Sequence, residues 1–132
     1  MINFRTFIFL LEAANITSKE IKDVEAFADK LFLKMGLDVK FTKHFKDRLY
    51  DKRNKKPINK LELLSLFTRT FNQYKSTINK MKPDDQAVIK DLVNNLNLPF
   101  VISFEKKVMQ LVPKTIMRKK DFKTSNKQLM VT

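Results

Sequence analysis

The sequence predicts an α+β domain in which N-terminal helices are followed by a small antiparallel β-sheet of three to four strands. Two observations support this order. Before residue 95, apolar residues recur every three or four positions, as on one face of an α-helix. After Asn97 they alternate with polar residues, as in strands with one buried face. The chain has 132 residues and is 43% hydrophobic, which suits one domain with a modest core.

The first two predicted helices flank a short extended segment. Thr17 and Glu20 have the spacing of a capping box, so we expect a helix over residues 18–35, which ends at the only glycine of the chain. Alternation over residues 37–41 suggests a short strand or an extended link. A second, basic helix is expected over residues 43–53.

Two further helices are predicted before the sheet. Asn59 and Glu62 repeat the capping pattern and begin a third helix that continues to about residue 75. Pro83, followed by two aspartates, opens a fourth helix that continues to about residue 93. The two aspartates would face the positive end of that helix dipole.

The remaining segments are expected to form the sheet. Apolar and β-branched residues alternate with polar ones over residues 100–104, 108–112 and 115–118, and these three strands are separated by turn residues. Residues 128–131 are a candidate edge strand. No internal repeat and no Gly/Ser linker is visible, so residues 13–132 are predicted to form a single basic domain with a basic C-terminal segment.

The composition excludes several classes of chemistry. Cysteine is absent and there is one histidine, so no thiol nucleophile, thiolate metal site or histidine cluster is available. There is no glycine-rich phosphate loop, nucleophile elbow or His-Glu-x-x-His motif. We therefore expect no cofactor and no metal, and any reaction would have to be metal-independent.

The net charge of +13 indicates a polyanionic partner, most often nucleic acid. Arg5 and Glu12 cancel each other, so the excess belongs to the remaining body of the chain. The same positive charge would also attract an anionic membrane or an acidic protein. The alternative is a lysine-rich surface that merely reflects an AT-rich genome.

Two segments concentrate the basic residues, one around the second helix and one over residues 114–127. Serine and threonine in the second segment can also bind phosphate oxygens. One aromatic residue, Phe122, lies there, so we expect no platform for stacking bases. The alternative for residues 114–127 is an ordinary solvated face. The predicted nucleic-acid contacts are Lys43, Lys52, Arg53, Lys55, Lys56, Arg118, Lys119, Lys120 and Lys123.

The first fifteen residues have the character of a targeting peptide. They carry an apolar stripe at helical spacing, formed by Phe4, Phe7, Ile8 and Leu11. The stretch resembles the capsid-targeting peptides of T-even-like contractile-tailed phages. Those peptides begin Met-x-x-Phe/Tyr-x-x-Phe-Ile and end at a prohead-protease site of the form Leu/Ile-x-Glu followed by a small residue.

Leu10, Glu12 and Ala13 match that protease site. The resemblance implies that residues 1–12 dock on phage scaffold or capsid proteins and are then removed, which leaves the protein in the virion head. The alternative is an amphipathic first helix that packs on the body of the protein. The apolar run is too short to cross a bilayer, so no integral membrane association is expected.

A second resemblance concerns possible catalysis. His44 and Arg48 are four residues apart on one helix face, so an imidazole and a guanidinium can meet at one phosphate. Residues 41–63 resemble the opening of the barnase/EndoU/colicin/RelE-like fold, a superfamily of small metal-free ribonucleases and toxins. That resemblance implies His44, Arg48, Lys114 and Thr115 as active residues. The alternative for His44 is a surface histidine without a chemical role.

Together these observations predict a basic phage virion protein that binds nucleic acid. It would be located in the phage head, and in the host cytoplasm during assembly or after injection. An injected, metal-independent ribonuclease-like toxin is one form of this prediction. The alternative is a purely structural head or neck component without nucleic-acid chemistry, whose basic face meets neighbouring subunits.

Overall fold

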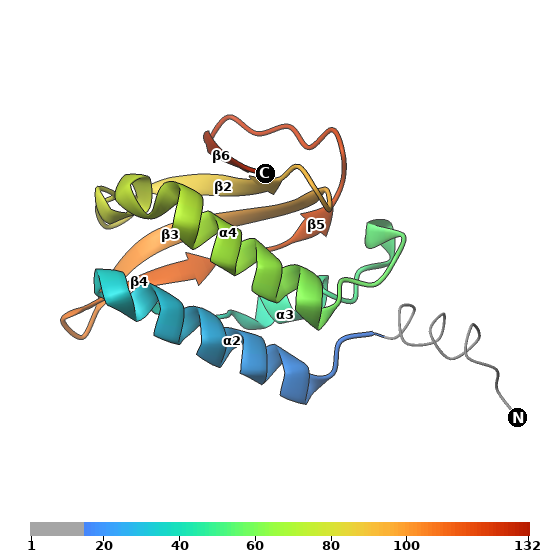
Figure 1. Cartoon of the computed structure of the whole chain (residues 1–132), viewed down its shortest axis with the longest axis horizontal. Coiled ribbons are helices and arrows are strands. Elements are labelled where there is room, and N and C mark those ends of the chain that lie inside the picture. Colours follow the sequence, from blue (N-terminus) through green and yellow to red (C-terminus); the bar gives the residue numbers. More distant parts are fainter. Residues whose placement is uncertain (1–14) are drawn as a thin grey trace, which may run out of the picture.

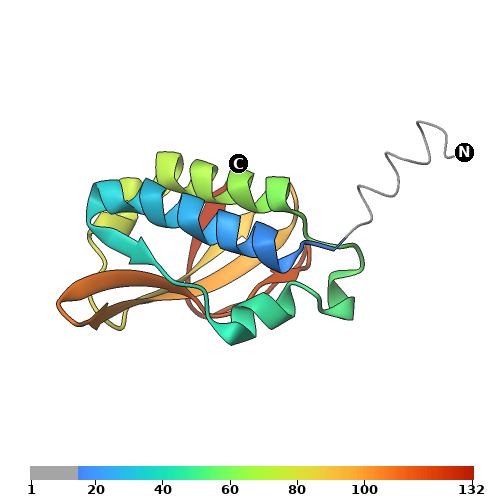
Figure 2. The same cartoon turned by 90° about the horizontal axis from the view of Figure 1, so that it is seen from below.

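The protein folds as two layers, with helices on one face of a β-sheet (Figures 1 and 2). A computed structural model describes residues 15–132. Helices α2 (Ser18–Phe32) and α4 (Lys60–Asn79) lie side by side over the sheet, and the shorter α3 (Lys43–Arg48) lies near one end. Two 3₁₀ helices, η1 (Leu33–Met35) and η2 (Lys52–Asn54), follow α2 and α3. None of the helices within the described residues is long and apolar enough to cross a membrane.

The sheet has six strands of mixed direction. Its main order is β1-β4-β3-β2-β6, and β5 pairs with β3 beside this path. Strands β2, β3 and β4 are mutually antiparallel, whereas β1 is parallel to β4 and β6 is parallel to β2. The strands are β1 (Leu37–Val39), β2 (Gln86–Asp91), β3 (Leu96–Glu105), β4 (Val108–Pro113), β5 (Met117–Arg118) and β6 (Lys127–Val131).

The α+β class is therefore confirmed, but the sheet is larger than predicted and is not purely antiparallel. The two parallel pairs arise because the edge strands come from distant parts of the sequence. β1 lies before α3, and β6 is the last element of the chain. Alternation within a segment predicts a strand but carries no information on which partner it pairs with.

The predicted fourth helix is wrong, because residues 86–91 form strand β2. Ala87, Val88 and Ile89 are all buried, and a short continuous apolar run fits either a buried strand or a helix. Pairing with β3 on one side and β6 on the other satisfies the backbone of this central strand. The two aspartates after Pro83 belong to the turn before β2, where Asp84 has a φ of 74°.

Both predicted capping boxes are confirmed. The Thr17 hydroxyl accepts the amide of Glu20 at the start of α2, and Asn59 accepts the amide of Glu62 at the start of α4. α2 continues through η1 to Gly36, whose φ of 74° is the left-handed conformation that ends the helix. The predicted second helix was too long, because α3 ends at Arg48.

The C-terminal strands differ in detail from the prediction. β4 ends at Pro113 and β5 begins at Met117, so Lys114 and Thr115 lie between strands rather than at the start of one. The predicted edge strand over residues 128–131 is confirmed as β6.

Side chains from the helices cover both edges of the sheet. On β1, the backbone amide of Val39 donates to the Asp29 carboxylate of α2 at 2.9 Å. On β6, the Tyr74 hydroxyl of α4 donates to the carbonyl of Met130 at 2.7 Å. Edges covered in this way are poor sites for adding a further strand. The charged ends of the molecule are therefore the better candidates for an interaction surface.

Candidate nucleic-acid interface

A buried asparagine joins the two basic segments that were predicted from the sequence. Asn54, at the end of η2, is 2% exposed. Its side-chain amide donates to the carbonyl of Arg48 at 2.9 Å, and its side-chain oxygen accepts the backbone amide of Arg118 at 2.9 Å. Asn54 therefore ties the end of α3 to β5, which comes 64 residues later in the chain.

A second contact ties the other end of α3 to the end of β4. The Thr42 hydroxyl, which accepts the amide of Phe45 and so caps α3, lies 3.4 Å from the carbonyl oxygen of Pro113 and can donate to it. Residues 42–54 thus lie alongside residues 113–118, with a hydrogen bond at each end. We call the basic side chains of residues 43–56 and 114–127, except that of Arg118, the first basic surface.

The first basic surface contains most of the charge of the protein. Residues 43–56 carry seven Lys and Arg against two Asp, and residues 114–127 carry six against one. These two segments therefore account for +10 of the net charge of +13. A cationic field concentrated in this way attracts a polyanion more strongly than the same charge spread evenly over the molecule.

Most of the predicted phosphate contacts are exposed on this surface. Lysine side chains of this kind act as flexible point charges that suit contact with a nucleic-acid backbone. The predicted contacts that are exposed are Lys43, Lys52, Arg53, Lys55, Lys56, Lys119, Lys120 and Lys123.

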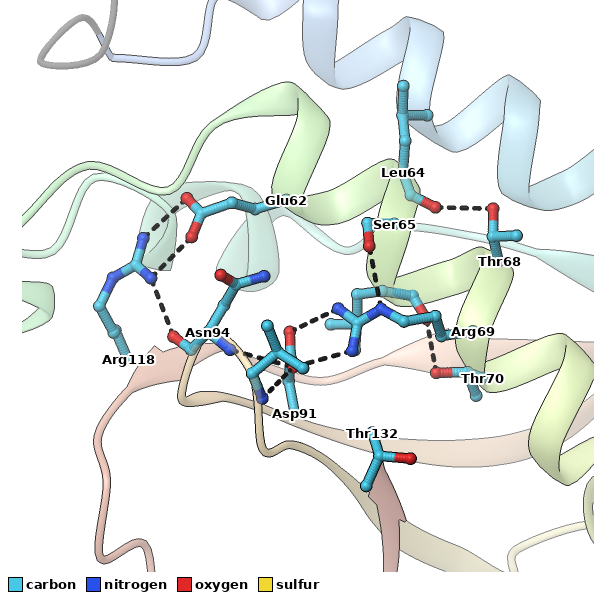
Figure 3. A network of polar contacts seen from close by, with 12 residues as sticks. Glu62, Leu64, Ser65, Thr68, Arg69, Thr70, Asp91, Asn94, Arg118 and Thr132 are labelled. Atoms are coloured by element: carbon cyan, nitrogen blue, oxygen red, sulfur yellow. Dashed lines mark hydrogen bonds and ion pairs between the residues drawn. The ribbon is translucent and has the colours of Figure 1, made fainter.

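Arg118 is the exception, because its guanidinium is used inside the fold (Figure 3). It forms two hydrogen bonds with the Glu62 carboxylate, at 2.8 and 2.9 Å. It also donates to the carbonyls of Asn94 and Pro57, both at 2.9 Å. The side chains of Arg118 and Glu62 are each 10% exposed. The structure gives Arg118 a structural role, and we remove it from the predicted phosphate contacts.

Asp51 organises the turn between α3 and η2. Its carboxylate accepts hydrogen bonds from Arg48 at 2.6 Å and from the Arg53 side chain at 2.9 Å. The Arg53 side chain, then its backbone amide and Arg48, hold the pKa of Asp51 well below its ordinary value. Asp51 therefore stays ionised and partly offsets two arginines, while the neighbouring lysines of this segment have no ion pair among the described residues.

The turn after η2 holds a lysine in an unusual backbone conformation. Lys55 has φ 66° and ψ −48°, and the amide of Lys56 donates to the carbonyl of Asn54 at 2.7 Å. Such a three-residue turn is strained for a residue with a Cβ atom. The strained residue lies directly beside the asparagine that joins the two basic segments.

The predicted catalytic residues are only partly brought together. His44 and Arg48 do share a helix face, since Arg48 Nε donates to His44 Nε2 at 3.3 Å. The Thr42 contact with the end of β4 brings their helix close to the stretch that contains Lys114 and Thr115. Among the described residues, however, no hydrogen bond joins His44 to either of them, and the Lys114 ammonium donates to Gln86 instead.

The predicted protease site at Leu10, Glu12 and Ala13 lies outside the described residues. Within residues 15–132, no group of three His, Cys, Asp or Glu side chains is arranged to hold a metal ion.

Sequence reasoning missed the residues that position the site. Asn54 is the only neutral residue in the run Lys52-Arg-Asn-Lys-Lys56, and this was the one available signal. Thr42 has the residue type of a helix N-cap, but its contact with β4 depends on the tertiary fold.

Comparison with known protein families, with curated proteins and with solved structures finds no match to this chain.

Proposed function

We propose that the protein binds nucleic acid through the first basic surface, mainly by contacts with phosphates. The observation that carries this proposal is the union, through Asn54 and Thr42, of two segments that hold +10 of the net charge. Lysines dominate the surface. The exposed Tyr50 is tied by its hydroxyl to the carbonyl of Ile16 and is not free to form a stacking platform. We expect weak base preference as a result.

The salt dependence of binding tests this proposal. Each phosphate contact that is lost should reduce the slope of log K against log salt by about 0.9 on a duplex. A variant with Lys55, Lys56, Lys119 and Lys120 replaced by Gln should lower the slope by up to about 3.6, on every sequence alike. Binding that does not change between about 50 and about 200 mM salt would contradict the proposal.

A matched control removes the same charge from elsewhere. Its four lysines make no ion pair among the described residues and lie outside the first basic surface. Replacing them by Gln should leave the slope almost unchanged. The control positions are Lys19, Lys22, Lys40 and Lys90.

We further propose that the protein is a component of a phage virion, with phage scaffold or capsid proteins as partners during assembly. This rests on the resemblance of residues 1–12 to capsid-targeting peptides. Mass spectrometry of protein from mature heads should find Ala13 at the N-terminus, and an intact Met1 would contradict the proposal.

Metal-independent RNA cleavage is a second candidate function, favoured by the contact between His44 and Arg48. The 2′-OH of RNA can attack the adjacent phosphorus when a base, a cation and correct placement are supplied. His44→Ala should then reduce cleavage in EDTA by about 10²- to 10⁴-fold and leave binding largely intact. Absence of RNase activity in EDTA would eliminate this candidate. Absence of any nucleic-acid binding would instead favour a purely structural head or neck component.

A further inference from the structure

A second group of basic residues lies at the opposite end of the molecule. Figures 1 and 2 show that the C-terminal ends of α2 and α4 and the β3–β4 hairpin lie together, away from η2 and β5. This end carries seven lysines against five acids, whereas the rest of the described chain outside residues 43–56 and 114–127 carries six basic residues against five acids. We call the seven the second basic surface: Lys30, Lys34, Lys75, Lys80, Lys82, Lys106 and Lys107.

Two of these lysines converge at one place. The ammonium groups of Lys34 and Lys75 lie 5.8 and 5.6 Å from the centre of the Phe71 ring. Neither makes an ion pair among residues 15–132. A hollow of about 390 Å³ lies beside them and is also lined by Ser76 and Asn79. Two ammoniums, a hydroxyl and an amide are the groups that commonly bind phosphate oxygens.

The β3–β4 hairpin places two more lysines at its tip. Lys106 and Lys107 are exposed and have φ values of 50° and 65°. Two-residue hairpin turns of this conformation favour Asn-Gly, because residues with a Cβ atom are strained there. Lysines near the helix C-termini also stabilise the helix dipoles, but that explanation does not apply to the hairpin. The hairpin therefore holds two cations at positions where other residues fit the backbone better.

The part of the first basic surface at η2 and β5 is separated from the second basic surface by the length of α4, whereas Lys114 and Lys127 lie beside the start of β2. This helix has 20 residues, and at about 1.5 Å per residue it spans about 30 Å. Its first turn contacts Arg118 beside the first surface, and its last turns carry Lys75 and Asn79 at the second. The separation exceeds the screening length of about 8 Å at physiological salt, so phosphates bound at one end do not neutralise the other.

We propose that the second basic surface binds a second nucleic-acid duplex, so that one protein molecule bridges two duplexes. This rests on the proposed function of the first surface. A short duplex is too stiff to wrap around both ends, since its persistence length is about 150 base pairs. Two separate duplexes, one at each end, can contact both surfaces without either duplex being bent.

A capture experiment with the full chain tests bridging directly. One duplex of about 30 base pairs, well below the persistence length, is fixed to beads, and a second, fluorescent duplex of the same length is added with protein. Wild-type protein should retain the fluorescent duplex on the beads. At excess protein, each duplex is bound by a separate protein molecule, so retention should fall. Because the second surface has fewer charges, bridging should be lost at a lower salt concentration than binding to one duplex.

The decisive variant replaces four lysines of the second surface by Gln: Lys34, Lys75, Lys106 and Lys107. It should bind a single duplex within about threefold of wild type, because the first surface is beyond screening distance. Its bridging should fall by at least about tenfold, as expected when several phosphate contacts are lost. The control with Lys19, Lys22, Lys40 and Lys90 replaced by Gln should bridge like wild type.

Other results would overturn the inference. Bridging that survives in the second-surface variant would show that two copies of the protein join duplexes through their first surfaces. Single-duplex binding by wild type without bridging would show that the second surface binds no nucleic acid. Absence of single-duplex binding would refute the proposed function and the bridging together, which distinguishes that failure from the others.

Discussion

Replacing Arg118 by Met should destabilise the fold strongly and have little direct effect on phosphate contacts. Arg118 and Glu62 are each only 10% exposed, and their paired hydrogen bonds measure 2.8 and 2.9 Å. The variant would leave the Glu62 carboxylate buried without its cation. It would also leave two backbone carbonyls, of Asn94 and Pro57, without their donor. Removing one partner of a buried pair typically costs about 3–5 kcal/mol.

This loss is a large fraction of a total stability of about 5–15 kcal/mol. Urea unfolding, followed by circular dichroism, should show the midpoint lowered by roughly 1–5 M, given slopes of about 1–3 kcal/mol per M. Arg118→Lys should restore little of the loss, because an ammonium cannot make the same paired hydrogen bonds.

Lys119→Met is the matched control, since this side chain is exposed. It should change the free energy of unfolding by no more than about 0.5 kcal/mol while lowering the salt slope of DNA binding by up to about 0.9. Arg118 would instead be a surface phosphate contact if Arg118→Met unfolded within about 1 kcal/mol of wild type and lowered the salt slope as Lys119→Met does.

Three further predictions concern stability. If residues 1–12 are a targeting peptide that docks on other proteins, protein lacking them should match the full chain in urea unfolding to within about 0.5 kcal/mol, and a larger loss would show that the peptide packs on the body. Burial raises the pKa of Asp91, but hydrogen bonds from Arg69 and two backbone amides outweigh this and lower it. The stability contributed by Asp91 is therefore complete above its ordinary pKa of about 4 and is lost as the pH falls through the lower folded value. Asp91→Asn should cost about 3 kcal/mol at neutral pH and make acid unfolding less steep below about pH 4, and an unchanged acid profile would contradict this. Replacing Lys106-Lys107 by Asn-Gly should stabilise the hairpin by up to about 1 kcal/mol in thermal unfolding while weakening duplex bridging, whereas destabilisation would show that these lysines support the fold.

The sequence could predict where α2 and α4 begin because their capping signals are local. Thr17 with Glu20 and Asn59 with Glu62 satisfy amides only three residues away, so the pattern specifies the contact. Strand β2 could not be assigned in the same way. Its apolar run fits two periods equally well, and its partners β3 and β6 decide between them.

The candidate interface likewise combines features that are visible in the sequence with features that appear only in the fold. The two basic segments were visible in the sequence, because charge belongs to each residue whatever the fold. Arg118 could not be separated from its lysine neighbours, since its partner Glu62 lies 56 residues away. Asn54 was equally hidden, because it matters only once η2 and β5 meet.

By itself the sequence determined the α+β class, the starts of α2, α3 and α4, the cationic character of the chain and the residue types available for chemistry. Each of these depends on composition or on contacts within one or two turns of a helix. Only the tertiary structure decided the mixed sheet, the inward role of Arg118 and the contact between the two basic segments. These depend on pairings between residues far apart in the chain, and a local pattern carries no information about such distant partners.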